Sequence, residues 1–321
     1  MRKQAAAAIL ASILAVGCSG GTDSNSTAKP LGERDLIVFS QANSQDPWRQ
    51  VFDAEMKSAA AAAGDKIQFE MAEAHDDPQT QISQVEAFLL KNPKALLISP
   101  ASESLTAICA KAFDKGIPVI VLDRGVEGEK YTTRIAGDNL KIGNSAAEYI
   151  GQKLGGKGTV LIIQGIQSTT ATEDRQNGAL DVFKAKYPGI KLIGNEHCDY
   201  QRVKAHDWMA NYLQTNPQFD AVYAHNDEMA IGAAMAMKEK GITGKIVVGV
   251  DACQMEVIEK IKSGDLTATF LYPHPAKRAI EVAMEILAGK KDIEKMITLE
   301  TMTIDASNAD QFLKDHPNLA K

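Results

Sequence analysis

Polar side chains stand at the ends of four separate apolar runs in this sequence. In chain order they are Asp123-Arg124, Gln164, Asn226 and Asp251. A carboxylate can accept two hydroxyl hydrogen bonds, a guanidinium presents a rigid fork of donors, and an amide both donates and accepts. Together these groups match the chemistry of a small, polar ligand that carries hydroxyls.

The apolar runs belong to a regular alternation of strand-like and helix-like segments. Ala95–Ile98 and Val119–Leu122 read as strands, and between them Leu105–Lys115 reads as a helix closed by Gly116. Strands interleaved with helices of about ten to fifteen residues predict βαβ units, parallel sheets and helices on both faces. Ligands bind beyond the carboxyl ends of such strands, so we expect the polar residues to share one cleft.

The number of strands predicts two α/β lobes. About ten strands alternate with helices, which is too many for one compact doubly wound sheet in a chain of this length. About 290 residues remain after the N-terminal segment, enough for two domains of ordinary size. The predicted fold class is therefore α/β, with two doubly wound parallel-sheet lobes.

Residues 1–18 resemble a bacterial lipoprotein signal peptide. Arg2 and Lys3 precede the apolar run Ala5–Val16, which is too short to span a bilayer, and small residues then lead to Cys18. We expect Cys18 to be lipidated, with ordinary signal cleavage as the alternative. Residues 19–33 are small and polar and should form a flexible tether. The mature protein is then expected in the periplasm or on the outer face of the cell membrane, held only by its lipid anchor.

The composition argues against several other classes of function. The net charge is −6 and the sequence pI is about 5.6, with lysine and arginine dispersed, so no basic face for nucleic acid is expected. Cys109, Cys198 and Cys253 are not at metal-ligand spacing with histidine. We expect no metal, no cofactor and three buried thiols, although one disulfide is a possible alternative.

Five short motifs occur in the order and at the spacing of a known family. They are Val121–Arg124, Ile163–Gly165, Ala171–Gly178 with Arg175 inside it, Ala224–Met229 and Val248–Asp251. Together, over residues 34–305, they resemble the periplasmic sugar-binding proteins of bacterial ABC transporters, in the ribose-binding-like class with the type I fold.

Two further stretches near the N-terminus refine the resemblance. Phe39–Gln41 and Pro47–Arg49 are more similar to the galactofuranose-binding branch than to the ribose binders. The ribose binders carry consecutive aromatic residues where this chain has Trp48-Arg49. A furanose of the galactose type is therefore the first expectation for the ligand, with another furanose or a pentose next.

The resemblance implies a type I periplasmic binding protein fold with two lobes joined by a three-strand hinge. Residues 34–137 and 273–299 would form the N-terminal lobe, and residues 138–272 and 300–321 the C-terminal lobe. The crossings would lie near Gly137, Tyr272 and Glu300. Because both lobes would contact the ligand, binding would shift the population toward a closed form.

The expected ligand-binding residues come from both lobes. They are Asp46, Trp48, Arg49, Ser99, Asp123, Arg124, Arg175, Tyr200, Asn226, Asp251 and Tyr272. By family position, Tyr272 lies at a hinge crossing and Ser99 replaces an amide of the ribose binders. Of the adjacent Asn226 and Asp227, we expect Asp227 to cap the next helix and Asn226 to face the ligand.

The chemistry of these residues suits an uncharged sugar. Trp48 and Tyr200 offer flat apolar faces to the C–H side of a sugar ring. Asp123 and Asp251 are each expected to pair with a guanidinium, which keeps a buried site near neutral. Arg49 reaches either the ligand or only the solvent.

Structural roles stay open for several of the same residues. Asp123 and Arg124 could form an ion pair that only stabilises a strand end. Asp251 could cap the following helix, and Trp48 could belong to the core.

The functional prediction is capture of a monosaccharide for delivery to a membrane ABC permease, by a protein expected to be monomeric. A lipoprotein that presents a sugar or autoinducer-2 to a chemoreceptor or a histidine kinase is the main alternative. A glycosidase with Asp123 and Asp251 as acid and base is less favoured, because Arg124 should keep a neighbouring carboxylate ionised.

Overall fold

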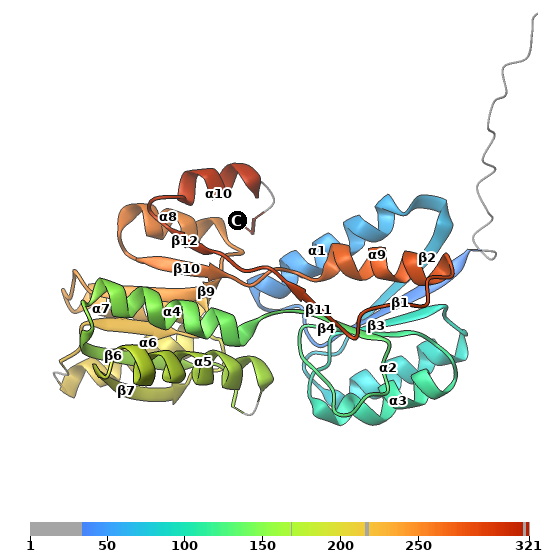
Figure 1. The fold of residues 1–321 in the computed structure, drawn as a ribbon, viewed down its shortest axis with the longest axis horizontal. Coiled ribbons are helices and arrows are strands. Elements are labelled where there is room, and N and C mark those ends of the chain that lie inside the picture. The colour runs from blue at the N-terminus through green and yellow to red at the C-terminus, as the bar shows by residue number, and fades with distance from the viewer. Residues whose placement is uncertain (1–33, 168, 216–217, 317–318, 321) are drawn as a thin grey trace, which may run out of the picture.

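The computed structural model describes residues 34–167, 169–215, 218–316 and 319–320. They form two α/β lobes arranged along the long axis of the molecule (Figure 1). The predicted signal peptide, Cys18 and the tether lie outside these residues. Within the described part of the chain, no helix is long and apolar enough to cross a membrane.

The first lobe contains a six-stranded sheet in the order β11-β5-β4-β3-β1-β2, with all neighbours parallel. Its strands are β1 (Asp35–Gln41), β2 (Ile67–Glu73), β3 (Ala95–Ile98), β4 (Val119–Leu122), β5 (Thr133–Gly137) and β11 (Met296–Leu299). Its helices are α1 (Pro47–Ala62), α2 (Pro78–Leu90), α3 (Thr106–Asp114) and α9 (Ala276–Leu287). Side chains of α1 and α9 pack on one face of the sheet, and side chains of α2 and α3 on the other.

The second lobe contains a six-stranded sheet in the order β12-β10-β9-β8-β6-β7. Its strands are β6 (Lys157–Gln164), β7 (Gly189–His197), β8 (Ala221–Ala224), β9 (Ile246–Asp251), β10 (Ala268–Leu271) and β12 (Thr303–Asp305), of which β12 is antiparallel to β10. Its helices are α4 (Asn139–Lys153), α5 (Thr170–Lys186), α6 (Arg202–Tyr212), α7 (Asp227–Glu239), α8 (Met255–Ser263) and α10 (Ala309–Asp315). Helices α4 and α5 cover one face, and α6, α7, α8 and α10 the other.

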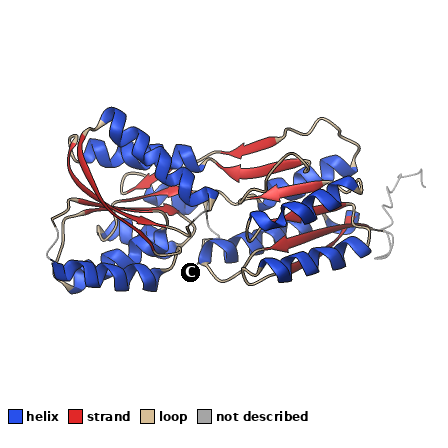
Figure 2. Cartoon of the chain, turned by 90° about the horizontal axis from the view of Figure 1, so that it is seen from below, coloured by secondary structure: helices blue, strands red, loops and turns tan. Residues whose placement is uncertain are grey.

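Burial on both faces explains the continuous apolar runs of the sequence. In β6, Val160 and Ile162 pack toward α4 and α5, whereas Leu161 and Ile163 pack toward α6 and α7. A parallel strand covered on both sides is apolar at every position instead of at alternate ones. Figure 2 shows the strands of each lobe lying between helices. The predicted class, two doubly wound parallel-sheet lobes, is confirmed.

The chain passes between the two sheets three times. It leaves the first sheet after Gly137, returns to the first lobe after Leu271, and runs from β11 into β12 between Leu299 and Thr303. The sequence did not reveal β11 and β12 as strands, because they are short and partly exposed. The carboxyl ends of β1 and β4, of β8 and β9, and the segment after β10 meet where the lobes face each other.

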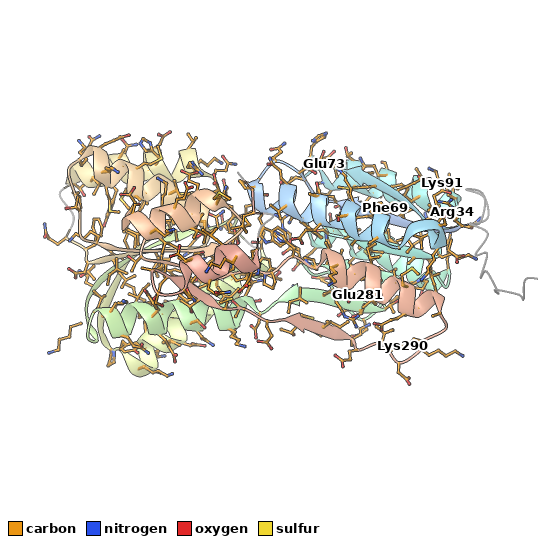
Figure 3. All side chains as sticks on the ribbon, turned by 90° about the horizontal axis from the view of Figure 1, so that it is seen from above. Arg34, Phe69, Glu73, Lys91, Glu281 and Lys290 are labelled. Atoms are coloured by element: carbon orange, nitrogen blue, oxygen red, sulfur yellow. The ribbon has the colours of Figure 1, made fainter. Side chains whose placement is uncertain are left out.

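Many charged side chains lie far from this meeting point. Arg34 and Lys91 lie at the outer end of the first lobe, away from the second lobe (Figure 3). Lys91 pairs with Glu70 at 2.5 Å on the exposed surface. Exposed pairs of this kind contribute little to stability.

Candidate functional site

A cavity between the lobes gathers most of the predicted ligand residues. Its lining consists of Asp46, Trp48, Arg49, Asp123, Arg124, Ala171, Arg175, Tyr200, Asn226, Asp251 and Tyr272. Of the predicted ligand residues, Ser99 does not line the cavity. Ala171 lines it but was not predicted. Ala171 lies inside a motif already recognised in the sequence, but a methyl side chain carries no chemical signal of its own.

Helix α1 brings three of the first-lobe residues to the cavity. Asp46 is its N-cap, and Asp46 Oδ1 accepts a hydrogen bond from the Arg49 N–H at 2.9 Å. Pro47 follows the cap, where a missing N–H and a fixed φ favour helix initiation. The first turn then carries Trp48 and Arg49, so the cap determines where both side chains point.

Arg49 and Asp123 form a buried ion pair on the first-lobe side of the cavity. Arg49 Nη2 donates to Asp123 Oδ2 at 2.7 Å, and the two residues are 3% and 5% exposed. Burial disfavours the carboxylate, but the Arg49 and Arg124 guanidiniums outweigh it and hold the pKa of Asp123 below its usual value. The solvent-facing alternative for Arg49 is therefore wrong.

The remaining bonds of Arg49 explain the position of Ser99. Arg49 Nη1 donates to Gln41 Oε1 at 2.7 Å and to Ser99 Oγ at 2.8 Å. Ser99 is fully buried, so its hydroxyl supports the guanidinium instead of facing the cavity. Gln41 was missed in the sequence, although it ends β1 as the other polar residues end their strands.

Arg124 does not form an ion pair with Asp123, which was the structural alternative for these two residues. Its Nη1 donates to the Ala101 carbonyl at 3.1 Å and lies 3.4 Å from Asp76 Oδ1. That alternative is wrong, because Asp123 is paired with Arg49, from another element. Arg124 still lines the cavity and adds positive charge beside Asp123.

Arg175 organises the second-lobe side. Its Nε donates to Asn139 Oδ1 at 2.9 Å, its Nη1 donates to the His225 carbonyl, and its Nη2 lies 3.5 Å from Asp251 Oδ1. Gly143 of α4 lets α5 approach closely, since a Cβ there would lie 2.3 Å from the Arg175 carbonyl oxygen. The close helix pair thus fixes the backbone that carries the guanidinium.

Of the two buried carboxylates in the cavity lining, Asp251 has fewer hydrogen-bond donors from the protein than Asp123. Burial raises its pKa well above the usual value, and the Arg175 guanidinium only partly opposes this. The following helix begins after Gln254, so the alternative that Asp251 caps it is wrong. Asp251 therefore keeps most of its hydrogen-bonding capacity, as an acceptor when ionised and with one O–H donor when protonated.

Tyr272 joins the two sides at a chain crossing. Its Oη donates to Asp123 Oδ1 at 2.8 Å, and its carbonyl accepts from Trp48 Nε1 at 2.9 Å. The Arg175 guanidinium lies 4.9 Å from the centre of its ring. At the other crossing, Gly137 makes room for this ring, since a Cβ there would lie 2.6 Å from it. Tyr272 is thus in contact with both lobes.

The expectation that Asp227 caps α7 is wrong, whereas Asn226 does lie at the cavity as predicted. Asn226 is the N-cap of α7, and its Oδ1 accepts from the Met229 N–H at 2.9 Å. Asn226 also lines the cavity, with its Nδ2 donating to the Tyr200 carbonyl at 3.1 Å. Asp227 is not the cap; its carboxylate accepts from the Ala252 N–H at 2.7 Å.

The lining is rich in charge but balanced. Three carboxylates, from Asp46, Asp123 and Asp251, face three guanidiniums, from Arg49, Arg124 and Arg175. Among the described residues, no group of histidine, cysteine and acidic side chains is placed to hold a metal ion. Cys109, Cys198 and Cys253 are buried free thiols, as expected. Such a site can bind a neutral molecule through many hydrogen bonds.

The cavity is small and opens into a larger cleft. Its volume is about 60 Å³, whereas the adjoining cleft measures about 690 Å³ and shares Asp46, Arg124 and Tyr200 with it. Ordinary small-molecule pockets begin at about 300 Å³. An ordinary small-molecule ligand is therefore larger than the cavity in this arrangement of the lobes.

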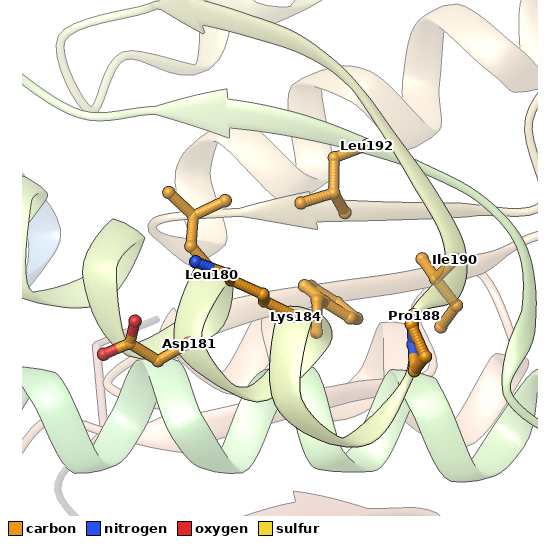
Figure 4. A pocket seen from close by; sticks show the side chains of 7 residues that line it. Leu180, Asp181, Lys184, Pro188, Ile190 and Leu192 are labelled. Carbon is orange, nitrogen blue, oxygen red and sulfur yellow. The ribbon is translucent and has the colours of Figure 1, made fainter.

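A second groove, of about 530 Å³, lies on the outer side of the second lobe between α5 and β7 (Figure 4). It is lined by Leu180, Asp181, Phe183, Lys184, Pro188, Ile190 and Leu192. Its charged groups, Asp181 and Lys184, do not converge on a point as the inter-lobe groups do. The inter-lobe cavity is therefore the candidate site.

Comparison with known proteins gives a consistent set of similarities. Residues 37–291 match the family described as periplasmic binding protein domain. The ribose import binding protein RbsB of Bacillus subtilis (strain 168) is 34% identical over 231 residues, which are 71% of this chain and 74% of that protein.

Two solved structures are similar over nearly the whole chain. The fructose-binding periplasmic domain of a hybrid two-component system is 33% identical, with a TM-score of 0.82, and the match covers 88% of this chain and 95% of that one. A galactofuranose-binding protein is 25% identical, with a TM-score of 0.83 and coverage of 89% and 99%.

Proposed function

The chain belongs to the periplasmic binding protein family, and from this premise we propose that it captures a neutral monosaccharide between its two lobes. The relatives are binding proteins and not enzymes, so the glycosidase alternative is set aside. The observation that carries the proposal is the balanced set of carboxylates and guanidiniums in one cavity lined by both lobes.

The hydrogen-bonding capacity left in the cavity supports a ligand that carries several hydroxyls. Each Asp123 oxygen accepts one hydrogen bond from the protein, from Arg49 and from Tyr272, and each keeps a free lone pair. Asp251 has one guanidinium 3.5 Å away and keeps still more capacity. Sugar hydroxyls can donate to these oxygens and accept from the unused guanidinium hydrogens.

The charge balance supports a neutral ligand. A sugar acid or a sugar phosphate would add unpaired negative charge beside three buried or half-buried carboxylates. Uncompensated charge in a poorly hydrated site is strongly unfavourable. A neutral sugar adds none, so every hydrogen bond that it makes contributes to binding.

The arrangement of the chain supports capture by closure. We propose that residues 34–137 with 273–299, and residues 138–272 with 300–321, move as two bodies about the three crossings. Asp123 belongs to the first body and Asp251 to the second, so a sugar bonded to both favours the closed arrangement. Separation of the bodies would admit the ligand to a cavity that is now only about 60 Å³.

A furanose of the galactose type is the leading ligand. Arg49 occupies a position where a second aromatic residue would offer only a stacking face, and it presents a guanidinium that is buried and fixed. The similarity to a galactofuranose-binding protein supports this choice. Ribose is disfavoured by the same residue, although a ribose import binding protein is among the relatives.

For the partner, we propose a membrane ABC permease that receives the sugar from a monomeric protein in the periplasm or at the outer face of the membrane. Lipidation of Cys18 remains part of this proposal. A second candidate is sensing, favoured by the similarity to a fructose-binding domain of a hybrid two-component system. Uptake of labelled sugar by cells lacking the protein separates the two: lost uptake supports transport, and unchanged uptake supports sensing.

A thermal-shift panel tests the proposed ligand class. The panel contains D-galactose, L-arabinose, D-ribose, D-fructose and autoinducer-2, with D-galacturonate and ribose 5-phosphate as charged controls. Binding to the folded state raises the melting temperature by an amount that grows with the logarithm of the ligand excess over Kd. We expect a rise with at least one neutral sugar and none with the charged controls. No rise with any neutral sugar would refute the proposal.

A further inference from the structure

Asp227 is a buried carboxylate that lies behind the cavity and does not line it. The residue is 1% exposed and is the first residue of α7, directly after its cap Asn226. Its Oδ2 accepts a hydrogen bond from the Ala252 N–H at 2.7 Å. Its Oδ1 has no hydrogen-bond partner within the part of the chain that the structure describes. The carboxylate is thus committed to the turn that follows Asp251.

That turn has an unusual backbone. Asp251 has a φ of 122° and Ala252 a φ of 55°, both in the left-handed half of the map that favours glycine. A Cβ makes such conformations unfavourable, and two in succession persist only where the surroundings hold them. The carboxylate that faces the ligand from the second lobe therefore stands on a strained turn.

Several bonds hold the turn in place. The Tyr272 N–H donates to the Asp251 carbonyl at 3.3 Å, and the Ala320 N–H donates to the Cys253 carbonyl at 2.9 Å. Both are bonds between backbone groups. The bond to Ala252, in contrast, comes from the Asp227 side chain, so a substitution can remove it alone.

Gly249 provides the space that this side chain needs. A Cβ at Gly249 would lie 2.2 Å from Asp227 Oδ1 and 3.0 Å from its Cα. Gly249 is in β9, two residues before Asp251. The strand that carries the ligand residue is therefore shaped to admit the carboxylate from the neighbouring helix.

We propose that Asp227 is a positioning residue for ligand binding: by holding the Ala252 N–H, it keeps the strained turn in the conformation that directs the Asp251 carboxylate into the cavity. Only the predicted effect on sugar affinity rests on the proposed function. The hold on the turn itself does not depend on any ligand.

The test compares Asp227→Ala with Asp227→Asn, because an asparagine Oδ1 can still accept from the Ala252 N–H. Calorimetric titration with D-galactose, L-arabinose, D-ribose and D-fructose gives the affinity of each variant for the sugar that the wild type binds. We expect a loss of at least tenfold in D227A and of less than threefold in D227N. Equal losses in the two variants would overturn the proposal.

A glycine at position 252 separates positioning from a general structural role. Glycine adopts a φ of about 55° without strain, so the turn no longer needs the carboxylate. We expect Ala252→Gly to reduce the tenfold effect of D227A to less than threefold. An undiminished loss in the double variant would contradict the proposal. If D227A does not fold, the sugar affinity of the double variant D227S/A252G is compared with that of A252G alone. A loss of less than threefold is again expected, and a loss of tenfold or more would again contradict the proposal.

Hydrogen exchange at the Ala252 amide makes the test independent of any ligand. We expect slow exchange in the wild type and in D227N, and exchange at least tenfold faster in D227A. If no sugar binds the wild type but this pattern appears, the proposed function fails while the hold on the turn stands. Unchanged exchange in folded D227A would overturn the positioning role.

Discussion

Tyr272 Oη donates a hydrogen bond of 2.8 Å to Asp123 Oδ1, and this bond joins a chain crossing to a carboxylate of the first lobe that lines the cavity. The Tyr272 carbonyl also accepts from Trp48 Nε1, and its ring lies under the Arg175 guanidinium of the second lobe. The proposed movement of one lobe against the other would therefore disturb contacts at the site. Tyr272 would thus link the proposed binding to the proposed lobe movement.

Removal of the Tyr272 hydroxyl tests that link. We predict that Tyr272→Phe lowers the free energy of unfolding by about 1.5–3 kcal/mol, because a buried carboxylate loses a donor. Sugar affinity should change as well. Tyr149→Phe is the matched control, since its hydroxyl donates to Asp305 at 3.1 Å outside the cavity. Denaturant titration and calorimetry should find a loss below about 1 kcal/mol and unchanged affinity for this control.

The buried pair of Arg49 and Asp123 should be far more important than the pair of Arg124 and Asp76. We predict that Asp123→Ala lowers the free energy of unfolding by about 3–5 kcal/mol, since it removes the buried partner of Arg49 and leaves only the more exposed Asp46, 3.8 Å away. Asp76→Asn should cost less than about 1 kcal/mol, because the carboxylate is 44% exposed and an asparagine can still accept the hydrogen bond from Asn43 and adopt the φ of 57°. Equal effects in denaturant titrations would show that the Arg49 pair is not buried in solution.

Trp48 should report sugar binding by fluorescence. The sequence contains two tryptophans, Trp48 in the cavity lining and Trp208 on α6, stacked on Tyr212 with ring centres 5.0 Å apart. We predict that sugar changes the emission of the wild type and of Trp208→Phe, but not of Trp48→Phe. The reverse pattern, with the signal lost in the Trp208 variant, would place the ligand elsewhere.

Asp227 should make stability depend on pH. Burial raises its pKa to about 7, against the opposing effect of the hydrogen bond from the Ala252 N–H. Because the folded-state pKa lies above the unfolded one, this group stabilises the fold below about pH 4 and the contribution is lost as pH rises through about 7.

The comparison with Asp227→Asn isolates this contribution. Relative to the asparagine variant, the wild type should lose of the order of 4 kcal/mol between about pH 4 and about pH 8. Denaturant titrations of both proteins across this range measure the difference, which also contains the change at Asp251, because the Asp227 charge helps to raise the pKa of Asp251. A difference that is constant or that grows with pH would contradict the assignment.

The strand-end pattern predicted much of the site because parallel strands deliver their carboxyl ends to one edge. Asp123, Asn226 and Asp251 each follow a strand of the alternating pattern, and all three line the cavity. The alternation of strands and helices can be recognised in the sequence because strands that are buried on both faces are continuous apolar runs. The strands β11 and β12 lack this signal, since they are short and half exposed.

Side-chain pairing could not be predicted in the same way. Adjacent side chains leave the backbone in different directions, and Asp123 has a φ of 61°, which turns it away from its neighbour Arg124. Its partner Arg49 lies 74 residues away in sequence. Only the packing of α1 against the sheet brings the two groups together.

Capping posed a similar difficulty. Asn226 and Asp227 are both good N-cap residues by type. The backbone decides between them: Asn226 is extended, with a φ of −151°, whereas Asp227 already begins the helix. The freed Asp227 carboxylate can then hold the turn at Ala252, a role that requires knowledge of where β9 ends beside α7.

A crystal structure of the protein with the neutral sugar that raises its melting temperature most would test directly whether the sugar is captured between the lobes. We predict sugar hydroxyls within about 3.2 Å of carboxylate oxygens of both Asp123 and Asp251, with the ring against Trp48. A sugar that contacts only one lobe, or that lies in the groove between α5 and β7, would contradict capture between the lobes.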